Sequence, residues 1–222
     1  MIFKNLFSGF IGFVLILSPV WAQDMEREAG SLTRFFPHWD EYLSTREEER
    51  SAFSPVYIVN SDRGPSPDAI EMWYQSSDMR VEFDIREDGR IMNPPSQGEL
   101  EQSPQVWVNQ PAGTMSMTVR FEPLLAMSSV YDVVDFELSM QQVNQAMRQT
   151  GGVAALFSPE FKTVSFIFDG IVPEAWAIHE DGSRTPLLVQ ENLAVYRSSH
   201  RSMRRVVRLE FGHAPQSMVL VP

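Results

Sequence analysis

Histidine and serine are among the residue types in this chain that could carry nucleophilic or acid–base chemistry. The four histidines are His38, His179, His200 and His213. The chain has no Gly-x-Ser-x-Gly segment, which holds a serine nucleophile on a strand-to-helix turn, and no His-Glu-x-x-His pair, which binds zinc on one helix face. A serine–histidine–acid triad is recognised by its geometry and not by sequence order. We therefore assign no catalytic residue, and the sequence favours a protein that is not an enzyme.

Three of the histidines and two adjacent carboxylates could in principle bind a metal ion. His179, His200 and His213 fall in the last expected strands, and Glu180-Asp181 follows the first of them. Imidazole and carboxylate ligands suit zinc or copper, but no two of these histidines have the short spacing of a ligand pair. We interpret them as surface histidines and assign no metal and no cofactor. A periplasmic metal handler is an alternative.

Methionines and paired acids give two further chemical patterns. Met115 and Met117 share one face of an expected strand, where thioethers suit Cu(I) but more commonly fill a core. Glu87-Asp88 and Glu180-Asp181 are acid pairs of the type that glycoside hydrolysis requires. Both pairs precede a glycine in segments typical of hairpin turns. The preferred interpretation is a core strand and two turns.

Aromatic residues raise the question of sugar binding, because flat rings can stack on the apolar faces of sugars. The tryptophans of the chain after its first segment are Trp39, Trp73, Trp107 and Trp176. Each lies in an amphipathic segment, which favours core positions. A glycan-binding module or carbohydrate-active enzyme is the alternative, and a patch of exposed tryptophan with facing carboxylates would support it.

A basic stretch near the C-terminus is the candidate partner-binding site. It contains Arg197, Arg201, Arg204, Arg205 and Arg208. Acidic residues concentrate far from it: the net charge is −10 over residues 23–101 and only −2 over residues 102–222, which include the basic stretch. These arginines could dock an acidic partner: an envelope protein, the acidic half of a neighbouring copy, an anionic glycan or a lipid headgroup. A solvated protein surface is the preferred interpretation.

Composition excludes several classes of protein. The chain has 222 residues, a formal net charge of −11 and no cysteine. An acidic protein lacks the basic surface that neutralises nucleic-acid phosphates. Without cysteine there is no disulfide framework, no thiolate metal site and no lipid attachment to a thiol. We expect no nucleic-acid partner.

Residues 1–22, MIFKNLFSGFIGFVLILSPVWA, have the layout of a secretory signal peptide. Lys4 supplies the positive start, and Leu6 to Leu17 form an apolar run shorter than the roughly 20 residues needed to span a bilayer. We expect cleavage after Ala22, no membrane span in the mature chain, and a periplasmic or secreted location. An uncleaved N-terminal anchor is the alternative.

Two helices and many short strands are expected along the rest of the chain. Apolar spacing predicts a helix over residues 37–53, and capping-box spacing at Ser139 and Gln142 predicts a second over 139–151, ended by Gly151-Gly152. Short apolar alternations bounded by turn residues predict strands. These strands cover residues 55–60, 70–75, 79–85, 105–109, 114–122, 162–168, 174–179, 186–190, 193–196, 205–211 and 217–221.

The pattern predicts a mainly β, sandwich-like fold, and two fragments repeat in it. Phe83 to Gly89 resembles Trp176 to Gly182, and Val119 to Glu122 resembles Val207 to Glu210, at similar offsets. Two related tandem β units joined by a short helical segment would explain this, as would ordinary hairpin composition. The expected organisation is a signal peptide (1–22), an acidic helical segment (23–54), a first β unit (55–125), a helical connector (126–160) and a second β unit (161–222).

One part of the chain resembles a known family. Residues 168–210 contain Gly170, then Pro173 five residues before Ile178, Asp181-Gly182, an apolar strand and a Val-x-Arg-Leu segment. This order is similar to the C-terminal β-sandwich of VirB9/TrbG-type components of conjugative secretion channels, over about a fifth of the chain. The resemblance implies a structural envelope protein that works through protein–protein contacts.

The sequence thus predicts a non-catalytic, exported cell-envelope protein that acts as a binding or scaffold module through protein–protein contacts. Exposed edge strands would offer main-chain hydrogen bonds to a partner. The glycan-binding protein, the component of a conjugative or secretion channel and the periplasmic metal handler are the alternatives.

Overall fold

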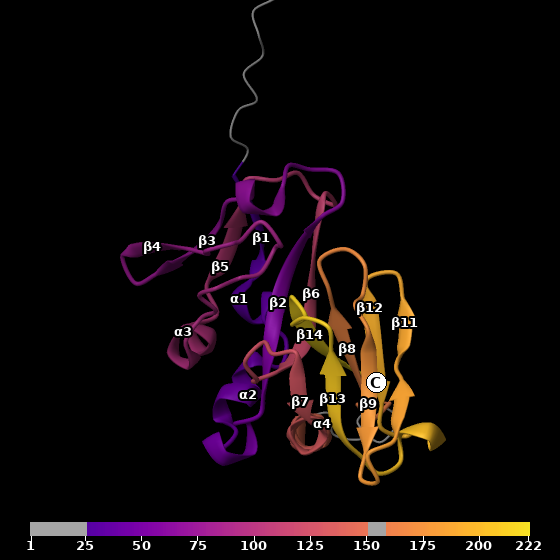
Figure 1. Ribbon diagram of the computed structural model, residues 1–222. Helices are drawn as coiled ribbons and strands as arrows, with labels where there is room; N and C mark the ends of the chain where they lie inside the picture. The colour runs from indigo at the N-terminus through magenta and orange to yellow at the C-terminus, as the bar shows by residue number, and fades with distance from the viewer. Residues whose placement is uncertain (1–25, 151–158) are drawn as a thin grey trace, which may run out of the picture.

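The computed structural model describes residues 26–150 and 159–222 and shows a mainly β protein with several antiparallel sheets (Figure 1). At this level the predicted fold class is confirmed. The expected signal peptide, residues 1–22, lies outside the described residues. Among the helices that are described, none is long and apolar enough to cross a membrane.

The largest sheet has six strands in the order β11-β12-β8-β14-β6-β2. They are β2 (Phe53–Ser61), β6 (Met115–Pro123), β8 (Thr163–Ile167), β11 (Leu188–Gln190), β12 (Leu193–Arg197) and β14 (Ser217–Val221). A bridge between Ile58 and Arg90 adds one more segment beside β2. At the opposite edge, β11 pairs only with β12 among the described strands.

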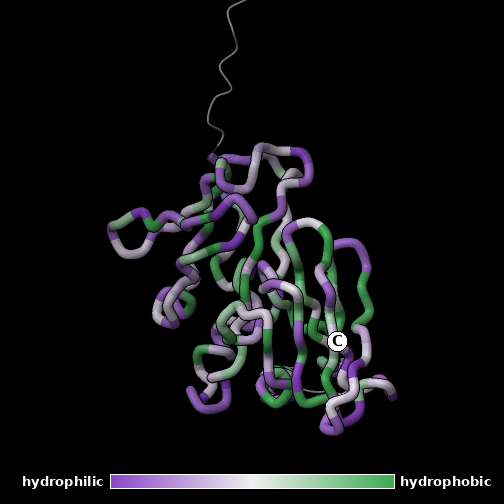
Figure 2. Tube along the Cα trace, in the orientation of Figure 1, coloured by the Kyte–Doolittle hydropathy of each residue, from purple (hydrophilic) through white to green (hydrophobic). Residues whose placement is uncertain are grey.

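A second sheet has four strands in the order β10-β9-β13-β7. Its strands are β7 (Val130–Asp132), β9 (Ala175–His179), β10 (Arg184–Pro186) and β13 (Val206–Phe211). Phe166 of β8 and Phe211 of β13 lie 4.7 Å apart between ring centroids, and Tyr131 and Phe136 contact the same cluster. The alternation of apolar side chains along these strands therefore builds the C-terminal core (Figure 2).

The N-terminal sheet has the order β1-β5-β3-β4. Its strands are β1 (Arg27–Ser31), β3 (Met72–Ser76), β4 (Met79–Glu82) and β5 (Gln105–Val108), and the nearby helical segments are α1 (Leu32–Phe35), α2 (Trp39–Ser44), α3 (Gln97–Gln102), η1 (Glu47–Glu49) and η2 (Pro67–Ala69). The buried Phe36 ring contacts Tyr57 of β2 at 4.8 Å and Phe83 at 5.4 Å. These contacts attach the N-terminal sheet to the six-stranded sheet.

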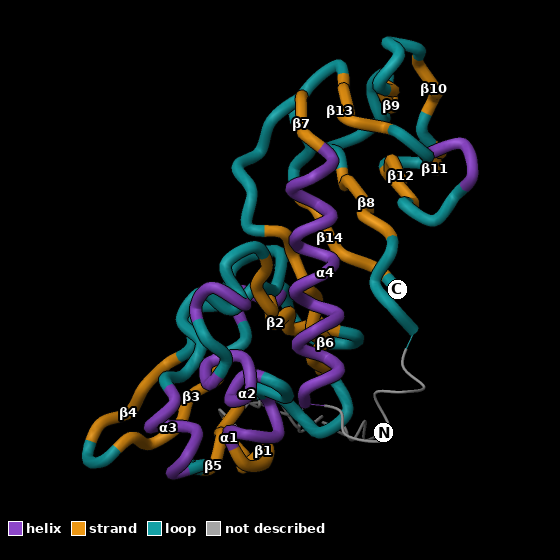
Figure 3. Tube along the Cα trace, turned by 90° about the horizontal axis from the view of Figure 1, so that it is seen from below, coloured by secondary structure: helices purple, strands orange, loops and turns teal. Residues whose placement is uncertain are grey.

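The long helix α4 (Val133–Thr150) runs from β7 towards β2 and β6 (Figure 3). It begins six residues before the expected start at Ser139, so the predicted capping box is wrong. Ser139 and Gln142 lie inside the helix, and both are buried. They bond instead to the segment before β2, and the expected stop at Gly151-Gly152 lies outside the described residues.

The helix expected over residues 37–53 is much shorter. Trp39–Ser44 forms α2, and the run of three acids forms only the single turn η1. Thr45 is extended, with φ −72° and ψ 142°, and its hydroxyl donates to the Glu41 carbonyl. The chain then enters β2 at Phe53. Tyr42 of α2 and Phe53 are buried in the same hydrophobic core, so the chain must turn between them.

Candidate functional site

The histidines do not converge on one site. His179 Nδ1 lies 3.0 Å from the Arg204 carbonyl oxygen, and its Nε2 lies 2.9 Å from the Thr185 hydroxyl, so both ring nitrogens have partners. The His213 ring packs edge-on against Phe168 at 5.4 Å. Across residues 26–150 and 159–222, no three histidine, aspartate or glutamate side chains gather closely enough to hold a metal ion.

The acid pairs lie in turns, as expected from the sequence. Asp181 accepts hydrogen bonds from the hydroxyl and the backbone N–H of Ser183, and these bonds lower the pKa of its carboxyl. Gly89 and Gly182 both have positive φ, of 80° and 78°. Asp88 accepts from the Arg90 N–H in the equivalent turn. The aspartate of each acid pair therefore stabilises a tight turn.

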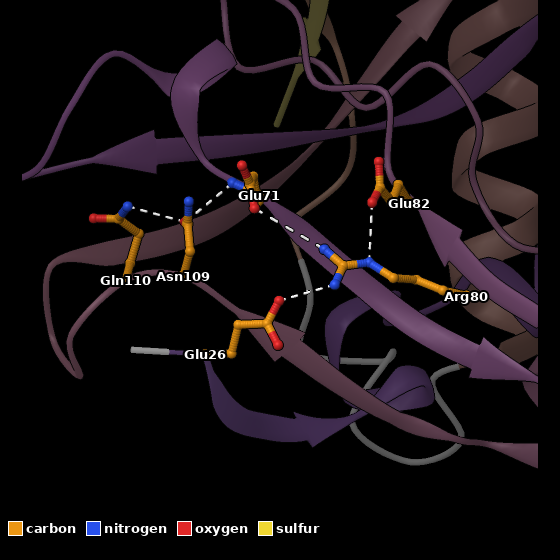
Figure 4. A network of polar contacts seen from close by, with 6 residues as sticks. All are labelled: Glu26, Glu71, Arg80, Glu82, Asn109 and Gln110. Carbon is orange, nitrogen blue, oxygen red and sulfur yellow. Dashed lines mark hydrogen bonds and ion pairs between the residues drawn. The ribbon is translucent and has the colours of Figure 1, made fainter. Parts of the chain in front are cut away.

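Trp73 and Trp107 form the most prominent aromatic pair outside the core. They are paired across β3 and β5, and their rings stack 5.6 Å apart at 11°. The Arg80 guanidinium lies 4.4 Å from the centroid of Trp73 and is held by Glu26 at 2.8 Å and Glu82 at 2.9 Å (Figure 4). Hydrogen bonding to Glu26 and the nearby carboxylates raise the pKa of Arg80.

This arrangement links β3, β4 and β5, and both tryptophan side chains are half-buried. Arg80 covers Trp73, and the buried Nε1 of Trp73 has no hydrogen-bond partner. Beside it, Asn109 accepts from the backbone N–H of Glu71 and from the side chain of Gln110 (Figure 4). Trp39 is buried and donates to the Pro95 carbonyl. A flat, exposed platform for a sugar ring is not formed by these residues.

Four of the five candidate arginines surround one turn. Arg197 ends β12, Arg201 begins the short helix η3 (Arg201–Met203), and Arg204 and Arg205 follow it. All four are exposed, and none of their guanidinium groups pairs with a carboxylate in the described part of the chain. Arg208 differs, because it lies on β13 and pairs with Glu210 at 3.1 Å.

The turn is fixed by its backbone, which leaves the side chains free. The backbone N–H of Glu180 donates to the Arg205 carbonyl at 3.0 Å, and His179 lies against the Arg204 carbonyl. Arg205 has a φ of 60°, a left-handed conformation that a non-glycine residue rarely adopts. The β9–β10 hairpin therefore holds the arginine turn in place.

Beside this turn lies a groove of about 440 Å³, which we call the β11 groove. It is lined by Pro186, Leu187, Leu188, Val195, Arg197, His200, Ser202 and Met203. Leu188 on the edge strand is 55% exposed, and Val189 beside it is 45% exposed. An apolar edge strand thus lies next to unpaired positive charge. The sequence pattern predicts the arginines as a candidate binding site. For Leu188 and Val189 it predicts only a strand.

A second groove of about 470 Å³, which we call the outer-sheet groove, lies over β2, β6, β8 and β14. Arg86, Arg90 and Arg120 are among its lining residues. Sequence reasoning placed Arg86 and Arg120 in the two repeated fragments and gave them no role. The sequence shows only that each repeated fragment contains a basic residue. The local sequence pattern does not indicate that Arg86 and Arg120 line the same groove.

Met115 and Met117 line a third hollow, together with Phe35, Arg27 and Arg34. Both methionines are half-buried and pack against the hydrophobic core. Arg27 donates to the backbone carbonyl of Gln110 at 2.6 Å, so its guanidinium is used in holding the loop. The two thioethers therefore act as packing groups in this arrangement.

Comparisons of the chain with protein-family models, with curated proteins and with solved structures found no match.

Proposed function

We propose that this chain is a non-catalytic binding module of the cell envelope, which docks an extended, acidic segment of a partner protein along β11. The observation that carries the proposal is the exposed apolar edge strand beside a groove with an unpaired arginine rim. Leu188 and Val189 leave about half of their surfaces open at this edge. Such an edge favours strand addition by a partner.

The groove supplies side-chain recognition next to the free edge. Leu187 and Met203 are buried residues of its lining, and Leu188 and Val195 line it as well. In strand addition, main-chain hydrogen bonds supply affinity, and pockets for alternate side chains supply specificity. An apolar side chain of the partner would fill the groove and cover Leu188.

The charge around the groove selects an acidic segment. Arg197, Arg201, Arg204 and Arg205 are exposed, and each lacks a carboxylate partner among the described residues. The chain as a whole has a net charge of −11. A locally positive rim on an acidic protein attracts carboxylates and repels other surfaces of the same sign.

The location and the finer fold belong to the same proposal. The signal-peptide layout of residues 1–22 supports a periplasmic or secreted location. The ring contacts between β8 and β13 support a sandwich-like packing of the two C-terminal sheets. Such packing would hold β11 and the arginine turn rigid, and a preorganised edge loses less entropy on binding.

The test is fluorescence anisotropy with a labelled eight-residue peptide of alternating valine and glutamate. We expect it to bind at least tenfold more tightly than the peptide with lysine in place of glutamate, with an affinity that falls as salt is added. Leu188→Asp should weaken binding at least tenfold, because it places a carboxylate on the edge strand.

Val207→Asp is the matched control, because Val207 is 44% exposed but lies on β13 between two other strands. It should leave binding within twofold of wild type. Equal affinity for the glutamate and lysine peptides, or equal losses in the two aspartate variants, would contradict the proposal.

A further inference from the structure

The outer-sheet groove is a second recessed surface, and it shares no lining residue with the β11 groove. Its floor includes Ile58 of β2, Arg120 of β6 and Ile167 of β8. One wall is the turn from Arg86 to Met92. The volume of about 470 Å³ lies within the range of small-ligand sites.

The wall of this groove is held against β2 at a fixed position. The Val59 N–H donates to the Gly89 carbonyl at 2.8 Å, and the Ile91 N–H donates to the Tyr57 carbonyl at 3.0 Å. A Cβ at Gly89 would lie 2.1 Å from the Val59 oxygen, so only glycine permits this approach. The arginines on either side of Gly89 are therefore positioned by the sheet itself.

The three arginines of the groove have different roles. Arg90 donates from Nη2 to both carboxylate oxygens of Glu122, at 2.7 and 3.0 Å, and both side chains are largely buried. Arg86 and Arg120 are exposed, and neither forms an ion pair or a side-chain hydrogen bond with any residue that the structure describes. Two guanidinium groups in the lining of the groove therefore remain available beside a fixed ion pair.

Apolar groups lie beside these charges. Met92 and Met127 are each 47% exposed, and the half-buried Ile167 lies on the floor with the buried Ile58. Methionine side chains are flexible and polarisable, so they adapt to apolar ligands of different shape. Guanidinium groups bind carboxylate and phosphate oxygens through paired N–H donors.

We propose that the outer-sheet groove binds an amphiphilic oxyanion, a carboxylate or phosphate group carried on a short apolar chain. Arg86 and Arg120 donate to the anionic group, and Met92, Met127 and Ile167 cover the chain. This site is independent of partner docking at β11.

Isothermal titration calorimetry of the whole chain with octanoate, octyl phosphate, acetate and octanol tests the site. We expect one octanoate or octyl phosphate to bind per chain, with the tighter of the two identifying the preferred anionic group. Acetate lacks the apolar chain and octanol lacks the charge, so each should bind at least tenfold more weakly.

The double variant Arg86→Gln/Arg120→Gln should weaken the tighter amphiphile at least tenfold, because exposed positions tolerate the change and only the charges are lost. Arg197→Gln, which alters the β11 groove, should leave that affinity within twofold. The proposal is overturned by any of three results: neither amphiphile binds, octanol binds as tightly, or the double variant binds as wild type does.

Discussion

At the scale of single residues, glycines with the same backbone conformation play different roles. Gly89 and Gly182 both have φ near 80° and both follow an acid pair. Gly89 faces the Val59 carbonyl, whereas no atom lies within 4 Å of a Cβ added at Gly182. The first glycine is therefore needed for close approach as well as for its φ, and the second for its φ alone.

Replacing these two glycines by alanine separates the two requirements. Gly182→Ala should lower the free energy of unfolding by about 1–2 kcal/mol, the ordinary cost of a left-handed residue. Gly89→Ala should lower it by about 3 kcal/mol or more, because the added Cβ also displaces the turn from β2. Urea unfolding followed by tryptophan fluorescence gives both values, and equal losses would show that the turn moves freely.

At the scale of elements, α4 is bonded to the segment that leads into β2. Gln142 donates to the Glu48 carbonyl at 2.8 Å and accepts from the Ala52 N–H at 2.8 Å. The Ser139 hydroxyl oxygen lies 2.8 Å from the Ala52 carbonyl oxygen, to which it donates a hydrogen bond. Ser139 and Gln142 have the spacing that is typical of a helix start. In the structure they instead join α4 to the distant segment before β2.

Gln142→Leu tests this clamp. We expect the free energy of unfolding to fall by about 2 kcal/mol, because the Ala52 N–H loses its side-chain acceptor and the Glu48 carbonyl loses one of its two side-chain donors. Gln141→Leu is the control, since Gln141 is exposed on the same helix and bonds to neither group. Urea unfolding of both variants measures the difference, and a loss as large in Gln141→Leu would argue against the clamp.

At the scale of the whole molecule, the core holds tyrosines whose hydroxyl groups resist ionisation. Burial raises the pKa of Tyr196 to about 12, and Glu137 adds to the effect. Burial also raises the pKa of Tyr57 and Tyr74. An unfolded tyrosine ionises near pH 10. The unfolded chain therefore releases protons that the folded chain keeps, and stability falls as pH rises from about 10 to 12.

Tyr196→Phe should reduce this loss. The variant lacks one phenol that stays protonated in the folded chain, so its free energy of unfolding should fall less steeply with pH, by up to about 1.4 kcal/mol per pH unit. Urea unfolding at about pH 9 and about pH 11 measures the two slopes. Parallel slopes for the variant and wild type would show that Tyr196 ionises as readily in the folded chain.

Local pattern was enough to locate most strands. Every expected strand overlaps an observed one, because alternation along a half-buried strand is visible within a few residues. The strands β1 and β7 were missed. Gly30 interrupts the first beside a shift in register, and the second is only three residues long. The local sequence pattern also does not show which strands pair with each other.

The repeated fragments show why pairing had to come from the tertiary structure. The segment from Phe83 to Gly89 leads into the bridge with β2, whereas the segment from Trp176 to Gly182 belongs to β9 and lies beside β13. Val119 to Glu122 lies in the six-stranded sheet, and Val207 to Glu210 lies in the four-stranded one. The expected boundaries of the two β units stay a prediction.

The mainly β class and the cluster of arginines from Arg197 to Arg205 follow from neighbours along the chain, so both could be predicted before the fold was known. In contrast, the position of Leu188 on an edge strand beside those arginines, and of Arg86 and Arg120 in the lining of one groove, depends on the folded arrangement of the described residues. The physical reason is that antiparallel pairing and core packing join segments with no fixed separation in sequence, so the same alternating pattern is compatible with many strand orders.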